Sequence, residues 1–496
     1  MSLSLETMLQ LCIILPMIAT VGIVATGRNP NLREGVTISA SLLVLYYVTR
    51  LYHGLQRGEV ISVQWWQPLP GLQLSFTIEP LGMIFALIAS FLWLITTVYS
   101  IGYMRSYNEE NQTRFYSYFS IAIGSVMGIT FAGNLFTLFI FYEMLTLSTY
   151  PLVTHAGTEQ AKKGGRIYLG ILLSTSIAFF LLAIVSTWFV AGTLDFKPGG
   201  VFGPNANTTV VGVILVLFIF GIGKAAIMPF HRWLPAAMVA PTPVSALLHA
   251  VAVVKAGVFT VLKVCVFIFG IDLLRVLPST QALLYLAGAT VLLASLVAMR
   301  QDNLKIRLAY STVSQLGYVT IGALLASPLG VVGSSMHIAM HAFGKITLFF
   351  CAGAILVAAH KSKISEMRGL GRQMPITMAA FFIASLSIIG VPPAGGTWSK
   401  WFLLVGSMEA QQWGIMVVLM LSSLLNIAYL LPIPIRAFSP GRETPSSEVG
   451  IKEAPLASLI ALCVTTVGCV VLFVYPQPLY ELAMAILETP GIAHDK

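Results

Sequence analysis

The sequence contains few charged residues. Asp, Glu, Lys and Arg make up 9% of its 496 residues, whereas hydrophobic residues make up 57%. An ordinary soluble domain carries about 25% charged residues, so a chain of this composition could not cover a water-facing surface. Lipid is therefore expected to surround most of the protein, which excludes a soluble domain as the bulk of the chain.

Motifs for redox or nucleotide chemistry are also missing. The sequence has no Walker A motif, no GxGxxG sequence that opens a helix after a strand, and no CxxC pair. Its cysteines lie in apolar stretches without metal-ligand spacing, which predicts small buried side chains. They are Cys12, Cys265, Cys351, Cys463 and Cys469. We therefore expect no cofactor in the chain itself.

Apolar runs recur along the whole sequence. A helix that crosses a bilayer needs about 20 apolar residues, so the length accommodates about fourteen such helices. Backbone groups find no water in lipid, which predicts helices for all of these runs. Their approximate limits are residues 7–26, 35–52, 80–104, 115–133, 134–153, 167–191, 209–228, 245–268, 281–299, 306–326, 329–358, 375–405, 412–438 and 454–475. The predicted fold class is an all-α integral membrane protein.

Lysine and arginine are distributed unevenly over the connections between these runs. The odd-numbered connections carry Arg28, Arg33, Arg105, Arg114, Lys162, Lys163, Arg166, Arg232, Arg300, Lys305, Arg307, Lys361, Lys363, Arg368, Arg372, Arg436, Arg442 and Lys452. The even-numbered connections carry Arg50, Arg57, Lys197 and Arg275. Because basic loops stay in the cytoplasm, both termini are expected on the opposite side. The same pattern explains the net charge of +9 without a nucleic-acid partner.

Further lysines fall inside the apolar runs. They are Lys224, Lys255, Lys263, Lys345 and Lys400. Lys263 lies near a helix end, so we expect its side chain to reach the interface. Among the acids, only Glu143 lies deep in a run. A charge at the bilayer centre costs at least about 3 kcal/mol, so we interpret the other four lysines and Glu143 as functional.

Glu143 and Lys224 lie in separate runs, and each can stabilise the charge of the other. Burial disfavours the charged form of a lysine, whereas a nearby carboxylate favours it. A lysine held between these influences changes its protonation when its partner moves. The pair is therefore predicted to act as a switch in a proton relay.

Two runs combine histidine with lysine. His249 and Lys255 share one run, whereas His337, His341 and Lys345 share another at a spacing of four, which places them on one helical face. Histidine titrates near neutral pH and passes protons through its two nitrogens, so this stripe is predicted to extend the relay. Two alternatives remain open, namely a metal site at His337 and His341 and simple hydrogen bonding between helices.

Two runs are interrupted by proline and glycine. Pro229 follows Lys224, and residues 392–396 contain Pro392, Pro393 and two glycines just before Lys400. Interrupted helices at matching places in two halves indicate inverted repeats around a transport path. We expect an N-terminal segment (1–114), a first repeat (115–268), a second inverted repeat (281–438) and a C-terminal loop and helix (439–496).

Five segments resemble the antiporter-like subunits that Mrp-type cation/proton antiporters, respiratory complex I and membrane-bound hydrogenases share. They are FYEMLTLSTYPLV, GKAAIMPFHRWLPAAMVAPTPVSALLHAVAVVKAG, LAYSTVSQLGYV, MHAFGKITLFFCAGAI and VPPAGGTWSKWF. The resemblance covers about residues 75–440. It implies fourteen helices with two inverted five-helix repeats, each with broken helices.

The resemblance also implies roles for residues. Glu143 and Lys224 correspond to the ion-pair glutamate and the broken-helix lysine of the family, and Lys400 to a terminal residue that faces the next subunit. The central relay residues would be His249, Lys255, His337, His341 and Lys345.

The amino-acid sequence of these segments is most similar to that of the D subunit of Mrp antiporters. That resemblance implies a proton-translocating subunit of a sodium/proton antiporter in the bacterial cytoplasmic membrane, with A- and C-type neighbours. One alternative is the same module in a redox-driven complex, either complex I-like or hydrogenase-like. Another is a scaffold whose ionisable residues only hold subunits together.

Overall fold

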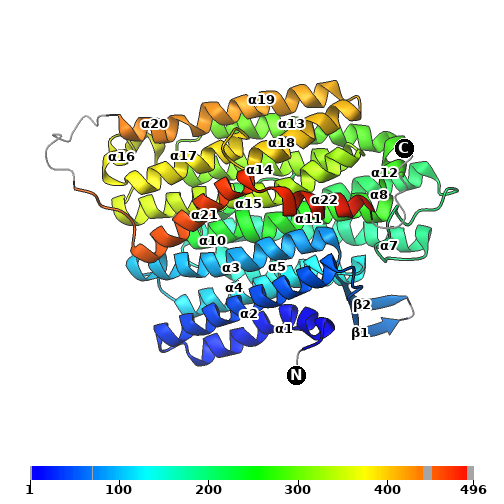
Figure 1. Cartoon of the computed structure of the whole chain (residues 1–496), viewed down its shortest axis with the longest axis horizontal. Helices are drawn as coiled ribbons and strands as arrows, with labels where there is room; N and C mark the ends of the chain where they lie inside the picture. Colours follow the sequence, from blue (N-terminus) through cyan, green and yellow to red (C-terminus); the bar gives the residue numbers. More distant parts are fainter. Residues whose placement is uncertain (1–2, 70, 440–449, 489–496) are drawn as a thin grey trace.

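The computed structural model describes residues 3–69, 71–439 and 450–488. Within these residues the protein is a bundle of roughly parallel helices with one small β-hairpin at an end (Figure 1). The bounds of the longer helices are α1 (Leu5–Ala25), α2 (Pro30–Gln56), α3 (Pro80–Ser106), α4 (Gln112–Thr130), α5 (Leu135–Val153), α13 (Pro278–Arg300), α14 (Leu304–Leu324), α15 (Pro328–Ala359), α19 (Trp413–Leu430) and α21 (Leu456–Val474).

Several membrane segments consist of more than one helical piece. They are α6 (Glu159–Thr175), η1 (Ser176–Phe180) and α7 (Leu181–Ala191); α8 (Thr208–Gly221) and η2 (Gly223–Ala225); α10 (Thr242–Ala246), η4 (Leu247–Val251), α11 (Val253–Val264) and η5 (Cys265–Phe269); and α17 (Pro375–Ile389) and α18 (Gly396–Glu409). The remaining short helices are α9 (Trp233–Ala236), η3 (Ala237–Val239), α12 (Ile271–Val276), η6 (Ile364–Glu366), α16 (Leu370–Gln373), α20 (Pro432–Phe438) and α22 (Gln477–Glu488).

The predicted runs all correspond to helical segments. In the described part of the chain, 10 helices are long and apolar enough to cross a membrane, and α8 and α17 are shorter apolar helices. The two remaining predicted runs correspond to α4 and α14. The all-α membrane fold is therefore confirmed, and the protein is a multi-pass membrane protein. The relation of the two halves by inversion stays a prediction.

The connections alternate between the two ends of the bundle. Odd-numbered connections contact one another: Arg114 donates to the His155 carbonyl at 2.7 Å and Lys305 to the Ala240 carbonyl at 2.5 Å. The Ile376 amide, at the eleventh connection, donates to the Glu453 carboxylate in the thirteenth at 2.7 Å. The basic loops thus share one end, as the sequence predicts. Arg442, in the thirteenth connection, and the terminal residues 1–2 and 489–496 lie outside the described residues.

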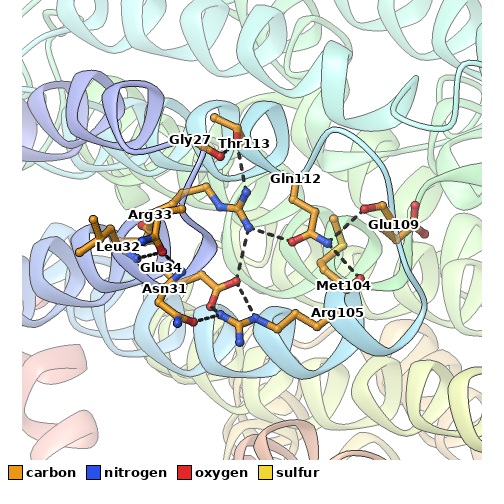
Figure 2. A network of polar contacts seen from close by, with 12 residues as sticks. Gly27, Asn31, Leu32, Arg33, Glu34, Met104, Arg105, Glu109, Gln112 and Thr113 are labelled. Atoms are coloured by element: carbon orange, nitrogen blue, oxygen red, sulfur yellow. Dashed lines mark hydrogen bonds and ion pairs between the residues drawn. The ribbon is translucent and has the colours of Figure 1, made fainter.

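A buried ionic clamp joins the first and third connections (Figure 2). The Glu34 carboxylate, with its side chain 4% exposed, lies between the guanidinium groups of Arg33 and Arg105. Arg33 also donates to Gln112 at 2.8 Å and to Thr113 at 3.2 Å. The clamp therefore fixes the start of α2 against the end of α3 and the start of α4.

The opposite end carries a β-hairpin that the sequence analysis missed. Strands β1 (Ser62–Leu69) and β2 (Leu72–Thr77) pair in antiparallel fashion. The hairpin joins other even-numbered connections through the backbone, because the Thr77 amide donates to the Phe131 carbonyl at 2.7 Å and the Phe196 amide to the Gly133 carbonyl at 3.2 Å. We call the β-hairpin, together with the connections that contain Phe131, Gly133 and Phe196, the outer frame. The amphipathic helix α22 was also not predicted.

The core lies around the helices that carry the candidate residues. The segment Thr242–Phe269, which contains α11, is entirely buried. In the most apolar stretch of α15, 78% of the residues are buried. Neither faces lipid for most of its length, so the polar side chains on these helices must find partners within the protein.

Removing the carboxylate of the clamp is expected to destabilise the fold. Glu34→Gln leaves the buried Arg33 without a carboxylate partner, and breaking a buried ion pair costs about 3–5 kcal/mol. Glu59→Gln is the matched control, because the Arg57–Glu59 pair is exposed and such pairs contribute at most about 1 kcal/mol. Denaturation of the purified protein in detergent measures both variants. Equal losses for the two would contradict the role of the clamp.

Candidate functional site

Lys224 lies in an interruption of its membrane segment. Helix α8 ends at Gly221, earlier than the predicted run 209–228, and Lys224 occupies the short turn η2. The ammonium donates to the Thr146 hydroxyl at 2.6 Å and to the Tyr142 carbonyl at 2.9 Å, both on α5. It also lies 3.2 Å from the centre of the Tyr142 ring, a cation–π contact. Three groups of one helix thus replace the water that this buried charge lacks.

The segment that carries His249 and Lys255 is not one continuous helix. A π-helical turn, η4, ends at Val251, and Ala252, with φ −112° and ψ −79°, distorts the backbone before α11 begins. His249 precedes this break and packs its ring on Phe349 at 4.5 Å, whereas Lys255 follows it. The Nζ atom of Lys255 lies 2.6 Å from His341 Nδ1 on α15. The irregular backbone at Ala252 thus lies between His249 and Lys255, which the sequence places in one predicted helix.

Two histidines of α15 continue from this contact. The His341 and His337 rings stack with their centres 5.7 Å apart. His337 Nδ1 lies 2.9 Å from the hydroxyl of Ser399, the residue before Lys400. The Tyr318 ring also stacks on His337, with the ring centres 5.5 Å apart. The stripe predicted from the spacing therefore exists, and it joins α11 to α18.

Lys400 folds back onto the second helix break. Helix α17 ends at Ile389 and α18 begins at Gly396, as the prolines and glycines predict. The Lys400 ammonium donates to the Ile389 carbonyl at 3.0 Å and to the Ser423 hydroxyl at 3.1 Å, and it lies 4.5 Å from the centre of the Tyr318 ring. The last carbonyls of a helix carry partial negative charge, so the end of α17 stabilises this cation.

Lys345 leaves the stripe toward α14. Its ammonium donates to the Ser311 hydroxyl at 2.6 Å and to the Leu308 carbonyl at 3.3 Å. Ser311 also accepts from the Tyr429 hydroxyl at 3.0 Å, which extends the polar contacts to α19. Each buried lysine thus pairs with a hydroxyl, a backbone carbonyl or a histidine from another element.

Comparison with protein families decides the assignment. The family model described as NADH:quinone oxidoreductase/Mrp antiporter, TM, matches residues 132–426. This is more than half of the chain, and it includes all the candidate residues described above. The chain belongs to this family. A second model, described as NADH-Ubiquinone oxidoreductase (complex I), chain 5 N-terminus, matches residues 66–116.

The relatives of this chain include subunits of NADH-quinone oxidoreductases and of a cation/proton antiporter. The chain is 32% identical to the NADH-quinone oxidoreductase subunit N of Desulforudis audaxviator over 460 residues, 90% of this chain and 91% of that protein. It is 32% identical to the A/B-type subunit of a probable K(+)/H(+) antiporter of Rhizobium meliloti over 379 residues, 75% of this chain. The match spans only 37% of the length of that second protein.

Solved structures share the fold. A chain of the Mrp complex from Dietzia sp. DQ12-45-1b superposes with a TM-score of 0.85 and 22% identity, covering 98% of both chains. A chain of the membrane-bound sulfane sulfur reductase, an archaeal respiratory membrane complex, superposes with a TM-score of 0.84 and 24% identity, covering 96% of both chains. One antiporter-like fold thus occurs in an Mrp complex and in a respiratory complex.

Glu143 and Lys224 form no direct salt bridge in the described part of the chain, although the charge of Glu143 acts on the Lys224 ammonium. Lys224 instead donates to Tyr142 and Thr146, which flank Glu143 on α5. Both carboxylate oxygens of Glu143 are buried without a hydrogen-bond partner. The physical reason is the course of η2, which brings the ammonium onto the Tyr142 ring and the Thr146 hydroxyl.

The expectation that Lys263 reaches the interface is wrong. Its side chain is 1% exposed, and its ammonium lies 2.6 Å from the Glu79 carboxylate at the start of α3. It also donates to the Ala132 carbonyl at 2.8 Å. The outer frame covers this end of α11, so the lysine cannot reach water and takes a buried partner instead. Glu79, 184 positions earlier in the sequence, gave no local signal of the pair.

The polar partners of the lysines were not predicted. They are Tyr142, Thr146, Ser311, Tyr318 and Ser423. Two further hydroxyls act one step away, because Ser399 contacts His337 and Tyr429 donates to Ser311. Hydroxyl side chains are frequent in apolar helices, where they bond to their own backbone, so the sequence does not distinguish these from the rest. The available signal is the density of hydroxyls in LAYSTVSQLGY, which becomes α14.

The histidine pair does not gather the ligands of a metal site. Among the described residues, no group of three His, Cys, Asp or Glu side chains lies close enough to hold an ion. The Nδ1 atoms of His337 and His341 contact Ser399 and Lys255. Their Nε2 atoms are buried without a partner, so each ring retains one nitrogen that can exchange a proton.

The second helix break depends on the lack of a side chain at Gly396. A Cβ atom there would lie 1.8 Å from the Ser387 carbonyl oxygen, so Gly396→Ala must push α18 away from α17. We expect a loss of more than about 2 kcal/mol in the free energy of unfolding, as overpacking typically costs 1–3 kcal/mol. Gly170→Ala is the control, because nothing lies near its Cβ position and alanine is the better helix former by about 1 kcal/mol. Denaturation should show opposite signs, and equal signs would contradict the packing argument.

Proposed function

We propose that this chain is the proton-translocating, D-type subunit of a multisubunit monovalent cation/proton antiporter. The observation that carries the proposal is the row of buried titratable groups in mutual contact across three elements. Lys255 on α11 meets His341, which stacks on His337, which meets the residue next to Lys400 on α18. Buried ionisable groups that face the interior of a helix bundle mark ion paths.

The first half supplies the switch in this proposal. The Lys224 ammonium donates to Tyr142 and Thr146. Glu143, the residue after Tyr142 on α5, has a carboxylate without a hydrogen-bond partner. A change of the lysine side chain toward Glu143 would pair the two charges and favour the protonated form of the lysine. The structure then represents the position in which the pair is open.

The switch also lies beside the row. Helix α11 packs against the turn that carries Lys224 because Gly257, two residues after Lys255, has no side chain. A Cβ atom there would lie 2.3 Å from the Lys224 carbonyl carbon. The close approach places the turn that carries Lys224 directly against the helix that carries Lys255.

The wider proposal follows the family. Protons cross this subunit in exchange for sodium or another monovalent cation, A- and C-type subunits are the neighbours, and Lys400 transfers protons at the boundary between subunits. The basic end of the bundle faces the cytoplasm of a bacterial cell.

A redox-driven complex is the second candidate. It is favoured by the relative named as subunit N of an NADH-quinone oxidoreductase, which matches over 91% of its own length. The buried row would serve equally well there, with electron transfer in other subunits as the driving reaction.

The test uses everted membrane vesicles from bacteria that lack their own antiporters and express the complete operon. A pH gradient is imposed, sodium is added, and the dissipation of the gradient is followed by a fluorescent dye. We expect sodium to dissipate the gradient with the wild-type chain and at least tenfold more slowly with Lys224→Ala at equal assembly. Lys162→Ala, at a lysine whose side chain is 57% exposed, should behave as the wild type.

Two results would contradict the proposal. A gradient built by a redox substrate and unaffected by sodium assigns the chain to a redox-driven pump. Unchanged transport per assembled complex in Lys224→Ala would make the buried lysine structural.

A further inference from the structure

A groove between α1 and α2 lies on the outside of the bundle. Its volume is about 620 Å³, and it is lined mainly by apolar side chains of both helices, such as Leu15, Ile18, Leu32 and Leu43. Ile18 and Leu32 are more than half exposed. Exposed apolar surface of this kind calls for an apolar covering, and the surrounding bilayer can supply one.

The groove ends beside the ionic clamp. Asn31 lines its end near the basic loops and accepts a hydrogen bond of 2.7 Å from Arg105. Figure 2 shows Asn31 next to the guanidinium group of Arg105. The apolar groove thus meets a polar, cationic cluster at the end of the bundle that carries the basic loops.

The cluster retains positive charge. Glu34 is the one carboxylate within ion-pair distance of Arg33 and Arg105 among the described residues, so it balances only one of the two cations. The Arg105 side chain is 44% exposed. Arg33 is buried, and its Nε atom has no hydrogen-bond partner. Arg28, exposed in the connection between α1 and α2, adds a further cation at this end.

We propose that this groove binds an anionic phospholipid. One acyl chain lies along the groove between α1 and α2, and the phosphate accepts hydrogen bonds from the free donors of Arg105, with Arg28 nearby. Nε and Nη2 of Arg105 donate to Glu34 and Asn31, which leaves Nη1 for a phosphate oxygen. Such a hydrogen bond is charge-assisted, and basic clusters beside membrane helices attract anionic headgroups. A zwitterionic lipid could fill the apolar groove, but its headgroup would not neutralise the excess positive charge. The inference does not depend on the proposed transport function.

A helix of a neighbouring subunit is the competing occupant. It would cover the same apolar side chains, but it would need to bring a carboxylate to Arg105 to match the charge. The commitment to a lipid rests on the combination of an open apolar groove between two helices with a cationic end, which matches one acyl chain and one phosphate.

The test uses the assembled complex in nanodiscs that contain phospholipid with a photoactivatable diazirine in its acyl chain. Two probes are compared, phosphatidylglycerol and phosphatidylcholine, and the labelled peptides are identified by mass spectrometry. We expect the anionic probe to label peptides that contain residues 15–43 at least fivefold more than the zwitterionic probe does.

Two variants close the site by different means. Gly35 lines the groove and has nothing within 4 Å of its Cβ position, so Gly35→Leu fills the groove without a clash. Arg105→Gln removes the exposed cation. Each should lower labelling by the anionic probe at least fivefold. The matched controls are Gly170→Leu, which also has open space at its Cβ position, and Arg50→Gln, which lies farther along α2; both should label as the wild type.

Several outcomes would overturn the proposal. Equal labelling by both probes means an unselective apolar groove. Labelling that persists in Gly35→Leu means that the lipid lies elsewhere. An absence of lipid labelling in the assembled complex, with zero-length cross-links from α1 or α2 to another subunit, means that a protein helix occupies the groove. Because Arg105 also belongs to the clamp, Gly35→Leu decides if Arg105→Gln does not assemble.

Discussion

Each buried lysine of this protein needs a hydrogen-bond acceptor inside the fold, because the bilayer core offers no water and an unsatisfied charge there is costly. The acceptors come from places where helices are interrupted or rich in hydroxyls. Lys400 uses the terminal carbonyl of α17, and Lys224, in a break of its own, uses α5. The helix breaks, the close packing at Gly257 and Gly396, and the hydroxyls of α14 all follow from this one constraint.

In the proposed function, the same constraint would allow the row of Lys255, His341, His337 and Lys400 to change its charge. The lysines and histidines of the row far outnumber the carboxylates near them, and Lys255 shares a short contact with His341. Neighbouring cations in a medium of low dielectric repel one another strongly, so the gain of a proton at one position opposes protonation at the next. Coupled titration of this kind lets a charge that moves at one end of a row influence the other end. An antiporter and a redox-driven pump can both use it.

The fold was largely predictable from the sequence, and the site only in part. Hydrophobic runs and the alternation of basic loops gave the helix order, because lipid imposes both patterns directly. The spacing of His337 and His341 correctly placed their rings together on α15, whereas the Lys345 ammonium turns toward α14. The pairs Lys263–Glu79 and Lys255–His341 join residues far apart in the sequence, which no local pattern reveals. The irregular backbone at Ala252 has no proline or glycine to reveal it. The hairpin β1–β2 was missed because it lies in a connection between two apolar runs.

The most direct test of the buried row is proton transport by His341→Phe in the assembled complex. Phenylalanine keeps a ring that can stack on His337 but removes the nitrogen that contacts Lys255. His53→Phe, at an exposed histidine of α2, is the control. The account predicts normal assembly and at least a tenfold loss of proton transport for His341→Phe, with no loss for the control. Transport at the wild-type rate in His341→Phe would show that protons do not pass between α11 and α15, and it would contradict the account.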